Sequence, residues 1–151
     1  MRAGDAQLVT HIGDREADLY EEWATVPDRY NRLLVRIKQD RRLVEKAQSL
    51  YCYLSFQPFS GSYRSRVEGD SRQTRTTREA VLSVRCTAVD IQRPDPLKDK
   101  NYPDRIRLYA VEATEANPPR GQKPVHQRLM TTHEVVCLEQ ALQVIEWDCW
   151  R

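Results

Sequence analysis

Short apolar runs separated by polar spans mark the first forty residues. Leu8–Ile12 is rich in β-branched residues and ends at Gly13, which predicts a buried strand. Apolar residues then recur at helical spacing, so we expect an amphipathic helix over 14–25, ended by Pro27. Leu33–Ile37 is apolar enough to predict a second strand inside a sheet. Strand, helix and strand with short connections indicate a βα unit that returns to a parallel neighbour.

The middle of the chain changes to strict alternation. Ala80–Val89 predicts a strand whose apolar face consists of Ala80, Leu82, Val84, Cys86 and Ala88. Further strands are expected at Ile106–Ala113 and Arg128–Thr132, with proline-rich connections at 92–104 and 117–124. This pattern predicts an antiparallel β module placed after the α/β start.

The last segment reads as a helix without a stop signal. Over Leu138–Arg151, the side chains Leu138, Ala141, Leu142 and Ile145 share one face. The chain is therefore divided into three segments: 1–44, a βα start; 45–135, a β-rich insertion; and 136–151, the beginning of a helix.

The charge is nearly balanced in total but not in layout. The 24 basic and 22 acidic residues give a net charge of +2, yet residues 1–30 carry −4 and the remainder carries +6. Within 62–85, six arginines face three acidic residues, which fits either a solvated loop or a phosphate-facing surface. An acidic start beside a basic body suits a metal-dependent enzyme that acts on a polyanion.

The cysteines, the histidines and the hydropathy argue against a cysteine–histidine metal site and against a membrane protein. The four cysteines form no CxxC pair and the three histidines fall at no metal-ligand spacing, so we expect reduced, half-buried thiols in a cytosolic protein. No run approaches the ~20 apolar residues of a membrane span. A soluble protein without a membrane partner is therefore expected.

Asp14 is the candidate chemical residue of the βα unit. It follows the first strand directly, and open α/β sheets place their sites at the carboxyl ends of strands. The same position suits a helix N-cap, which is the alternative interpretation.

Four stretches, in order and spacing, resemble one family. They are Gly13–Tyr20 (GDREADLY), Leu34–Arg36, Asn117–Gly121 with Leu129–Thr132, and Ala141–Trp147. Together they resemble bacterial cut-and-paste DDE transposases of insertion sequence family four, the hairpin-forming type. The resemblance implies an α/β plus β fold: a partial ribonuclease-H-like core, an antiparallel β insertion and a truncated C-terminal helix.

The resemblance also implies a chemistry and its residues. In the family, two aspartates and a glutamate hold two Mg²⁺ (or Mn²⁺) ions for DNA phosphodiester cleavage and strand transfer. Asp14 matches the second aspartate, and Glu16 and Asp18 are interpreted as first-turn helix residues. Arg36 matches an arginine that faces DNA, and Arg151 matches the arginine of the final helix signature.

Several family residues have no match here. The first aspartate would precede residue 1 and the glutamate would follow Arg151, so we expect this chain not to cleave DNA by itself. Asp148 stands where the family has a tyrosine, and Gln127 lies close to the position of a tryptophan used near a flipped base. These two departures put hairpin handling in doubt.

The resulting hypothesis is a part of a DNA transposase, a cytoplasmic, nucleoid-associated bacterial protein whose partner is DNA. The predicted DNA-binding residues are Arg36, Arg64, Arg66, Arg75 and Arg151. The alternatives are a non-catalytic module that binds DNA or inhibits the full-length transposase, and a degenerate product without function. A second copy of this chain and the full-length transposase are the candidate protein partners.

Overall fold

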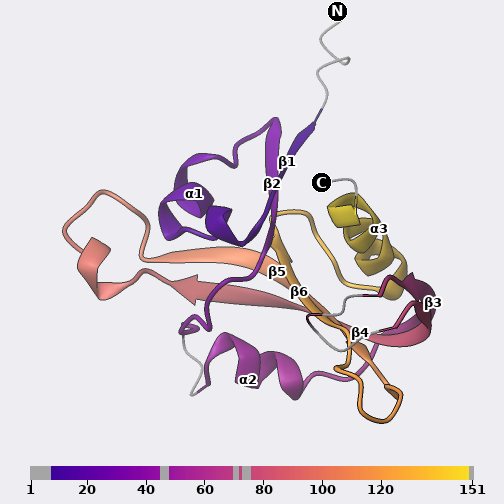
Figure 1. Cartoon of the computed structure of the whole chain (residues 1–151). Coiled ribbons are helices and arrows are strands. Elements are labelled where there is room, and N and C mark those ends of the chain that lie inside the picture. The colour runs from indigo at the N-terminus through magenta and orange to yellow at the C-terminus, as the bar shows by residue number, and fades with distance from the viewer. Residues whose placement is uncertain (1–7, 45–47, 70–71, 73–75, 150–151) are drawn as a thin grey trace, which may run out of the picture.

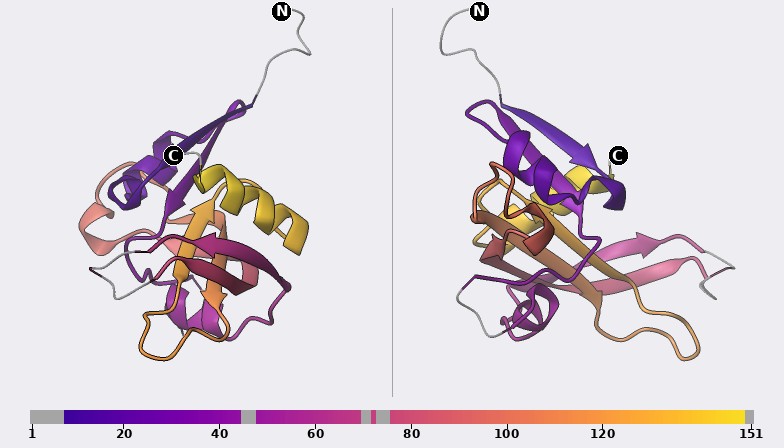
Figure 2. Two further views of the ribbon diagram at one scale, coloured as in Figure 1. Left: turned by 45° about the vertical axis from the view of Figure 1, so that its right-hand side comes forward. Right: turned by 90° about the vertical axis from the view of Figure 1, so that its left-hand side faces the viewer.

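The computed structural model describes residues 8–44, 48–69, 72 and 76–149. In these ranges the chain forms one curled, six-stranded sheet with the strand order β1-β2-β6-β5-β4-β3 (Figures 1 and 2). The strands are β1 (Val9–Gly13), β2 (Asn31–Arg36), β3 (Gly61–Val67), β4 (Arg78–Gln92), β5 (Arg105–Glu115) and β6 (His126–Thr131). The helices are η2 (Arg15–Ala17), α1 (Tyr20–Thr25), α2 (Leu50–Ser55), η4 (Asp95–Leu97) and α3 (Leu138–Cys149).

The predicted parallel start is confirmed. β1 runs parallel to β2, with Gly13 opposite Val35, so both strands end at the same edge of the sheet. β2 then pairs antiparallel with β6 through Val35 and Met130. Strands β6, β5, β4 and β3 follow as antiparallel neighbours. The predicted class, an α/β start joined to an antiparallel β module, is confirmed at this level, and one sheet runs through both.

The single helix expected over 14–25 is wrong. A 3₁₀ turn, η2, is followed by extended backbone at Leu19, and α1 begins only at Tyr20. The break occurs at Asp18, whose side chain is fully buried and accepts hydrogen bonds from Trp23 Nε1 (3.1 Å) and Lys38 N (2.7 Å). Asp18 also pairs with Arg41 at 2.8 Å, so it is an internal anchor and not a first-turn helix residue.

The sequence did not predict α2 or β3. α2 is a single short helix capped by Ser49, and β3 occupies part of the arginine-rich run. The solvated-loop interpretation of the run at 62–85 is therefore wrong for residues 62–67 and 78–85, which belong to the paired strands β3 and β4. Figure 2 shows the outer ends of β3 and β4 projecting from the rest of the fold.

The hydrophobic core has two layers, one on each face of the sheet. α1 and α2 cover one face through Tyr20, Trp23, Leu50 and Leu54. α3 covers the other through Ala141, Val144 and Ile145 (Figure 1). β4 serves both layers: Leu82 and Val84 face α3, whereas Val89 and Ile91 face α2.

The C-terminal helix is confirmed over Leu138–Cys149. Within the described part of the chain, no helix has both the length and the apolar composition needed to cross a membrane.

All four cysteines are free. The prediction that they are half-buried is confirmed for Cys86 and wrong for Cys52, Cys137 and Cys149, which are exposed.

Candidate nucleic-acid interface

A basic pocket lies where β2 stops and β6 continues beyond it. β2 pairs with β6 only at Leu129–Thr131, and Ile37 N then bonds to Arg128 O as the chain leaves the sheet. The first residues of β6 are left beside an open space of about 510 Å³. Its walls are Arg15, Arg36, Ile37, Lys38, Tyr51, Val125, His126, Gln127 and Arg128.

The lining of this basic pocket is one-sided in charge. Four of its side chains are permanent cations, and none is a carboxylate. Arg15 is exposed and has no carboxylate partner within the described residues, while Lys38 pairs at 3.1 Å with the exposed Glu16. Exposed pairs of this kind contribute little energy and exchange readily for another anion. The pocket is therefore suited to phosphate groups.

Arg36 is positioned by a buried carboxylate behind it. Its Nε donates to Asp148 Oδ2 at 3.0 Å, and Gln127 Nε2 donates to the same oxygen at 2.7 Å. The Asp148 side chain is 0% exposed, whereas Arg36 is 38% exposed. The two family departures, Asp148 and Gln127, thus contact each other and hold the arginine that was predicted to face DNA.

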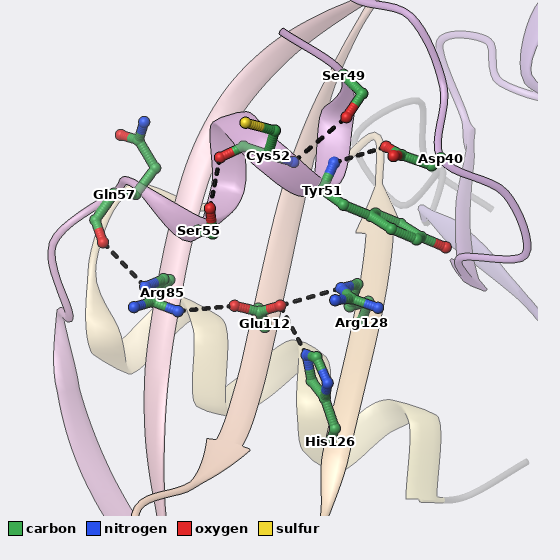
Figure 3. Close-up of polar contacts among 10 residues, drawn as sticks. All are labelled: Asp40, Ser49, Tyr51, Cys52, Ser55, Gln57, Arg85, Glu112, His126 and Arg128. Atoms are coloured by element: carbon green, nitrogen blue, oxygen red, sulfur yellow. Dashed lines mark hydrogen bonds and ion pairs between the residues drawn. The ribbon is translucent and has the colours of Figure 1, made fainter.

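Arg128 belongs to a second buried network on the α2 side of the sheet. Glu112 accepts from Arg128 Nε at 3.0 Å, from Arg85 at 2.9 Å and from His126 Nε2 at 2.7 Å. Arg85, Glu112 and Arg128 are cross-strand neighbours on β4, β5 and β6, and Figure 3 shows them in one row beside α2. The Tyr51 ring lies 4.0 Å from the Arg128 guanidinium carbon.

Charge and burial compete at Glu112 and Tyr51. Burial raises the pKa of Glu112, but hydrogen bonds from His126 and Arg85 and the charge of Arg128 outweigh it, so the pKa is lowered. Burial raises the pKa of Tyr51, so its phenol stays neutral in the basic pocket. Glu112 is therefore ionised at neutral pH, where it accepts the hydrogen bonds that orient Arg85 and Arg128.

Asp14 lies at the rim of the basic pocket. It is exposed and lines an adjoining hollow with Arg15, Glu16 and Arg36. Its Oδ1 accepts from Glu16 N at 3.0 Å, so the N-cap interpretation holds, with η2 as the capped helix. Residues 8–44, 48–69, 72 and 76–149 contain no group of three or more histidine, cysteine or carboxylate side chains arranged to hold a metal ion.

The other predicted DNA-binding arginines are dispersed. Arg64 and Arg66 are exposed on β3, away from the pocket lining, and Arg66 pairs with Glu68 at 3.1 Å. Arg75 and Arg151 lie outside the described residues. The structure therefore brings Asp14 and Arg36 together at one edge of the sheet, with neither Arg64 nor Arg66 in that group.

Sequence reasoning missed most of the pocket. Arg15, Lys38, Tyr51, His126 and Arg128 come from four separate stretches, and only the tertiary fold brings them together. Sequence position could have indicated two of these residues. Arg15 adjoins the candidate residue Asp14, and Lys38 follows the predicted second strand directly.

A scan of the sequence against protein-family models finds no matching family. The resemblance to DDE transposases accordingly stays a prediction, carried by the four stretches quoted for it.

Proposed function

We propose that this chain is part of a DNA transposase and that its own contribution is to hold the DNA backbone in the basic pocket at the carboxyl ends of β1 and β2. The observation that carries the proposal is the pocket itself, in which four permanent cations and no carboxylate line one hollow. Phosphate oxygens are the commonest partners of such side chains in protein–DNA complexes.

The way the cations are held supports a built site. Arg36 is fixed by the buried Asp148, and Arg128 is fixed by the buried Glu112 and stacked against Tyr51. Guanidinium groups that are already oriented lose less conformational entropy when they bind a phosphate. Arg15 and Lys38 add exposed positive charge around them.

The described residues do not fit the two-metal centre of the resembling family. Asp14 is flanked in its hollow by two guanidinium groups, and its neighbour Glu16 already pairs with Lys38. The adjacent guanidinium groups repel a divalent cation. Asp14 alone also supplies only a small part of the oxygen ligands that such an ion requires. The proposal therefore includes no cleavage step by these residues.

The experiment measures binding of this chain to a fluorescent random-sequence duplex of about 20 base pairs, at salt rising from about 50 to 200 mM. The test variant is Arg15→Ala/Lys38→Ala, since both side chains are exposed or half-exposed and their loss leaves the core intact. The matched control is Arg29→Ala/Lys100→Ala, which removes two exposed charges outside the pocket.

We expect measurable, salt-sensitive affinity that falls at least five-fold in the pocket variant and less than two-fold in the control. Absence of binding at the lowest salt, or equal losses in the two variants, would contradict the proposal.

A further inference from the structure

The α2 side of the sheet has an open region beyond the row of Arg85, Glu112 and Arg128. The next row consists of Ser62, Ser83, Thr114 and His126, which are paired in register across β3, β4, β5 and β6. All four are exposed or half-exposed. The row after it pairs the exposed Arg64 with Val81, which is 44% exposed. These six side chains, with Arg85 and Arg128, form what we call the open face.

An exposed aromatic ring borders the open face. Phe59 is 51% exposed, and its ring lies 4.0 Å from the guanidinium carbon of Arg85. Arg85 also donates to Gln57 O at 2.9 Å and to Glu112, and Figure 3 shows both contacts. A second ring, Phe56, is 72% exposed three residues earlier, at the end of α2. A core role accounts for neither ring.

The open face joins the basic pocket without a break. Arg128 and His126 line the pocket and also stand in the first two rows of the open face. The pocket cations Lys38 and Arg128 are thus followed on the open face by Arg85, with Phe59 packed on it, and by Arg64 beyond the intervening row of Ser62, Ser83, Thr114 and His126. Aromatic rings beside a cationic track are the arrangement that binds unpaired nucleotides, because a base can stack only where it is free of its partner.

We propose that the open face binds single-stranded nucleic acid, with a base stacked on Phe59 and the backbone following Arg128 and Arg64. The inference rests on the proposed function for its phosphate contacts, and it adds the kind of strand that is bound. A duplex presents its phosphates to the pocket but keeps its bases stacked inside, so Phe59 contributes to one ligand and not to the other.

The test compares two probes on the full chain: a fluorescent oligothymidine of about 12 nucleotides and a duplex of the same length, at about 50 mM salt. The variants are Phe59→Ala, the conservative Phe59→Tyr, and Val136→Ala as the control at another exposed apolar residue. Thermal melting of each variant checks that the fold is kept. We expect it to be kept, because Phe59 is 51% exposed and contributes little to the core.

We expect Phe59→Ala to weaken oligothymidine binding about five-fold or more while duplex binding changes less than two-fold. Phe59→Tyr and Val136→Ala are expected to bind both probes as the wild type does. Unchanged oligothymidine binding in Phe59→Ala, or equal loss of both probes, overturns the inference.

The outcomes separate this inference from the proposed function. If Arg15→Ala/Lys38→Ala loses both probes and Phe59→Ala loses neither, the phosphate pocket stands and the stacking site is refuted. If the wild type binds neither probe, both fail. Should Phe59→Ala instead convert a dimer into a monomer in sedimentation, the open face is a contact between two copies and the inference is also overturned.

Discussion

Arg36 and Asp148 connect the end of β2 to the last turn of α3, with 3.0 Å between Nε and Oδ2. The aspartate is fully buried and the arginine reaches the surface. This pair ties the orientation of a proposed phosphate ligand to the packing of the C-terminal helix. A change at Asp148 is therefore expected to affect binding without any contact between Asp148 and DNA.

The Arg36–Asp148 pair is expected to show strong coupling. Arg36→Ala removes a cation from the buried Asp148 carboxylate, and we expect it to lower the free energy of unfolding by about 3 kcal/mol. Asp148→Ala is expected to lower it by less, because Arg36 is 38% exposed and its guanidinium can turn towards water. Urea unfolding of both single variants and the double variant measures the coupling.

In this cycle the double variant should be more stable than Arg36→Ala alone. Strictly additive losses would show that the two side chains act independently, which the geometry does not allow.

Gly13 is required by the close approach of η2 to β1. A Cβ at Gly13 would lie 2.6 Å from the Ala17 Cβ, so Gly13→Ala must displace the turn that carries Asp14 and Arg15. We expect a loss of about 1–3 kcal/mol, measured by chemical denaturation. The double variant Gly13→Ala/Ala17→Gly removes the clashing methyl and should regain part of the loss; no recovery would rule out this contact as the cause.

Glu112 makes stability depend on acid pH. Its pKa in the fold is lowered from 4.5, so the folded state binds the proton more weakly than the unfolded state. The stabilisation is complete above about pH 4.5 and is lost as the pH falls through the lower folded value. Unfolding free energies of the wild type and Glu112→Gln should differ by about 2 kcal/mol or more at neutral pH and converge in acid.

The control for this pH dependence is Glu68→Gln, an exposed carboxylate paired with Arg66. It should follow the wild-type curve within about 0.5 kcal/mol. A constant difference between wild type and Glu112→Gln down to acid pH would contradict the proposed ionised network.

Most strands were predictable from the sequence because their apolar residues alternate or cluster. The parallel pair around Gly13 and Val35 and the α3 layer follow from such local patterns. The break at Asp18 did not, because its partners Lys38 and Arg41 lie about twenty residues away and only tertiary folding brings them together. α2 was missed because six residues are too few to reveal a helical period.

The candidate site was predictable only in part. Asp14 and Arg36 stand next to predicted strand ends, and the structure places both at one edge. Arg128 enters the site through the register of β6 with β5, and Tyr51 enters it from α2 by stacking on Arg128. Neither contact leaves a local signal in the sequence. The arginine run suggested a phosphate surface, yet the pocket uses different arginines.

The central claim is that the basic pocket binds the phosphate backbone of DNA. The most direct test is the slope of log K against log salt concentration for the duplex, compared between wild type and Arg15→Ala/Lys38→Ala. Each phosphate contact contributes about 0.9 to the magnitude of this slope, so the pocket variant should lose about 1.8. The Arg29→Ala/Lys100→Ala control should keep the wild-type slope. Equal slopes for wild type and pocket variant would contradict the account.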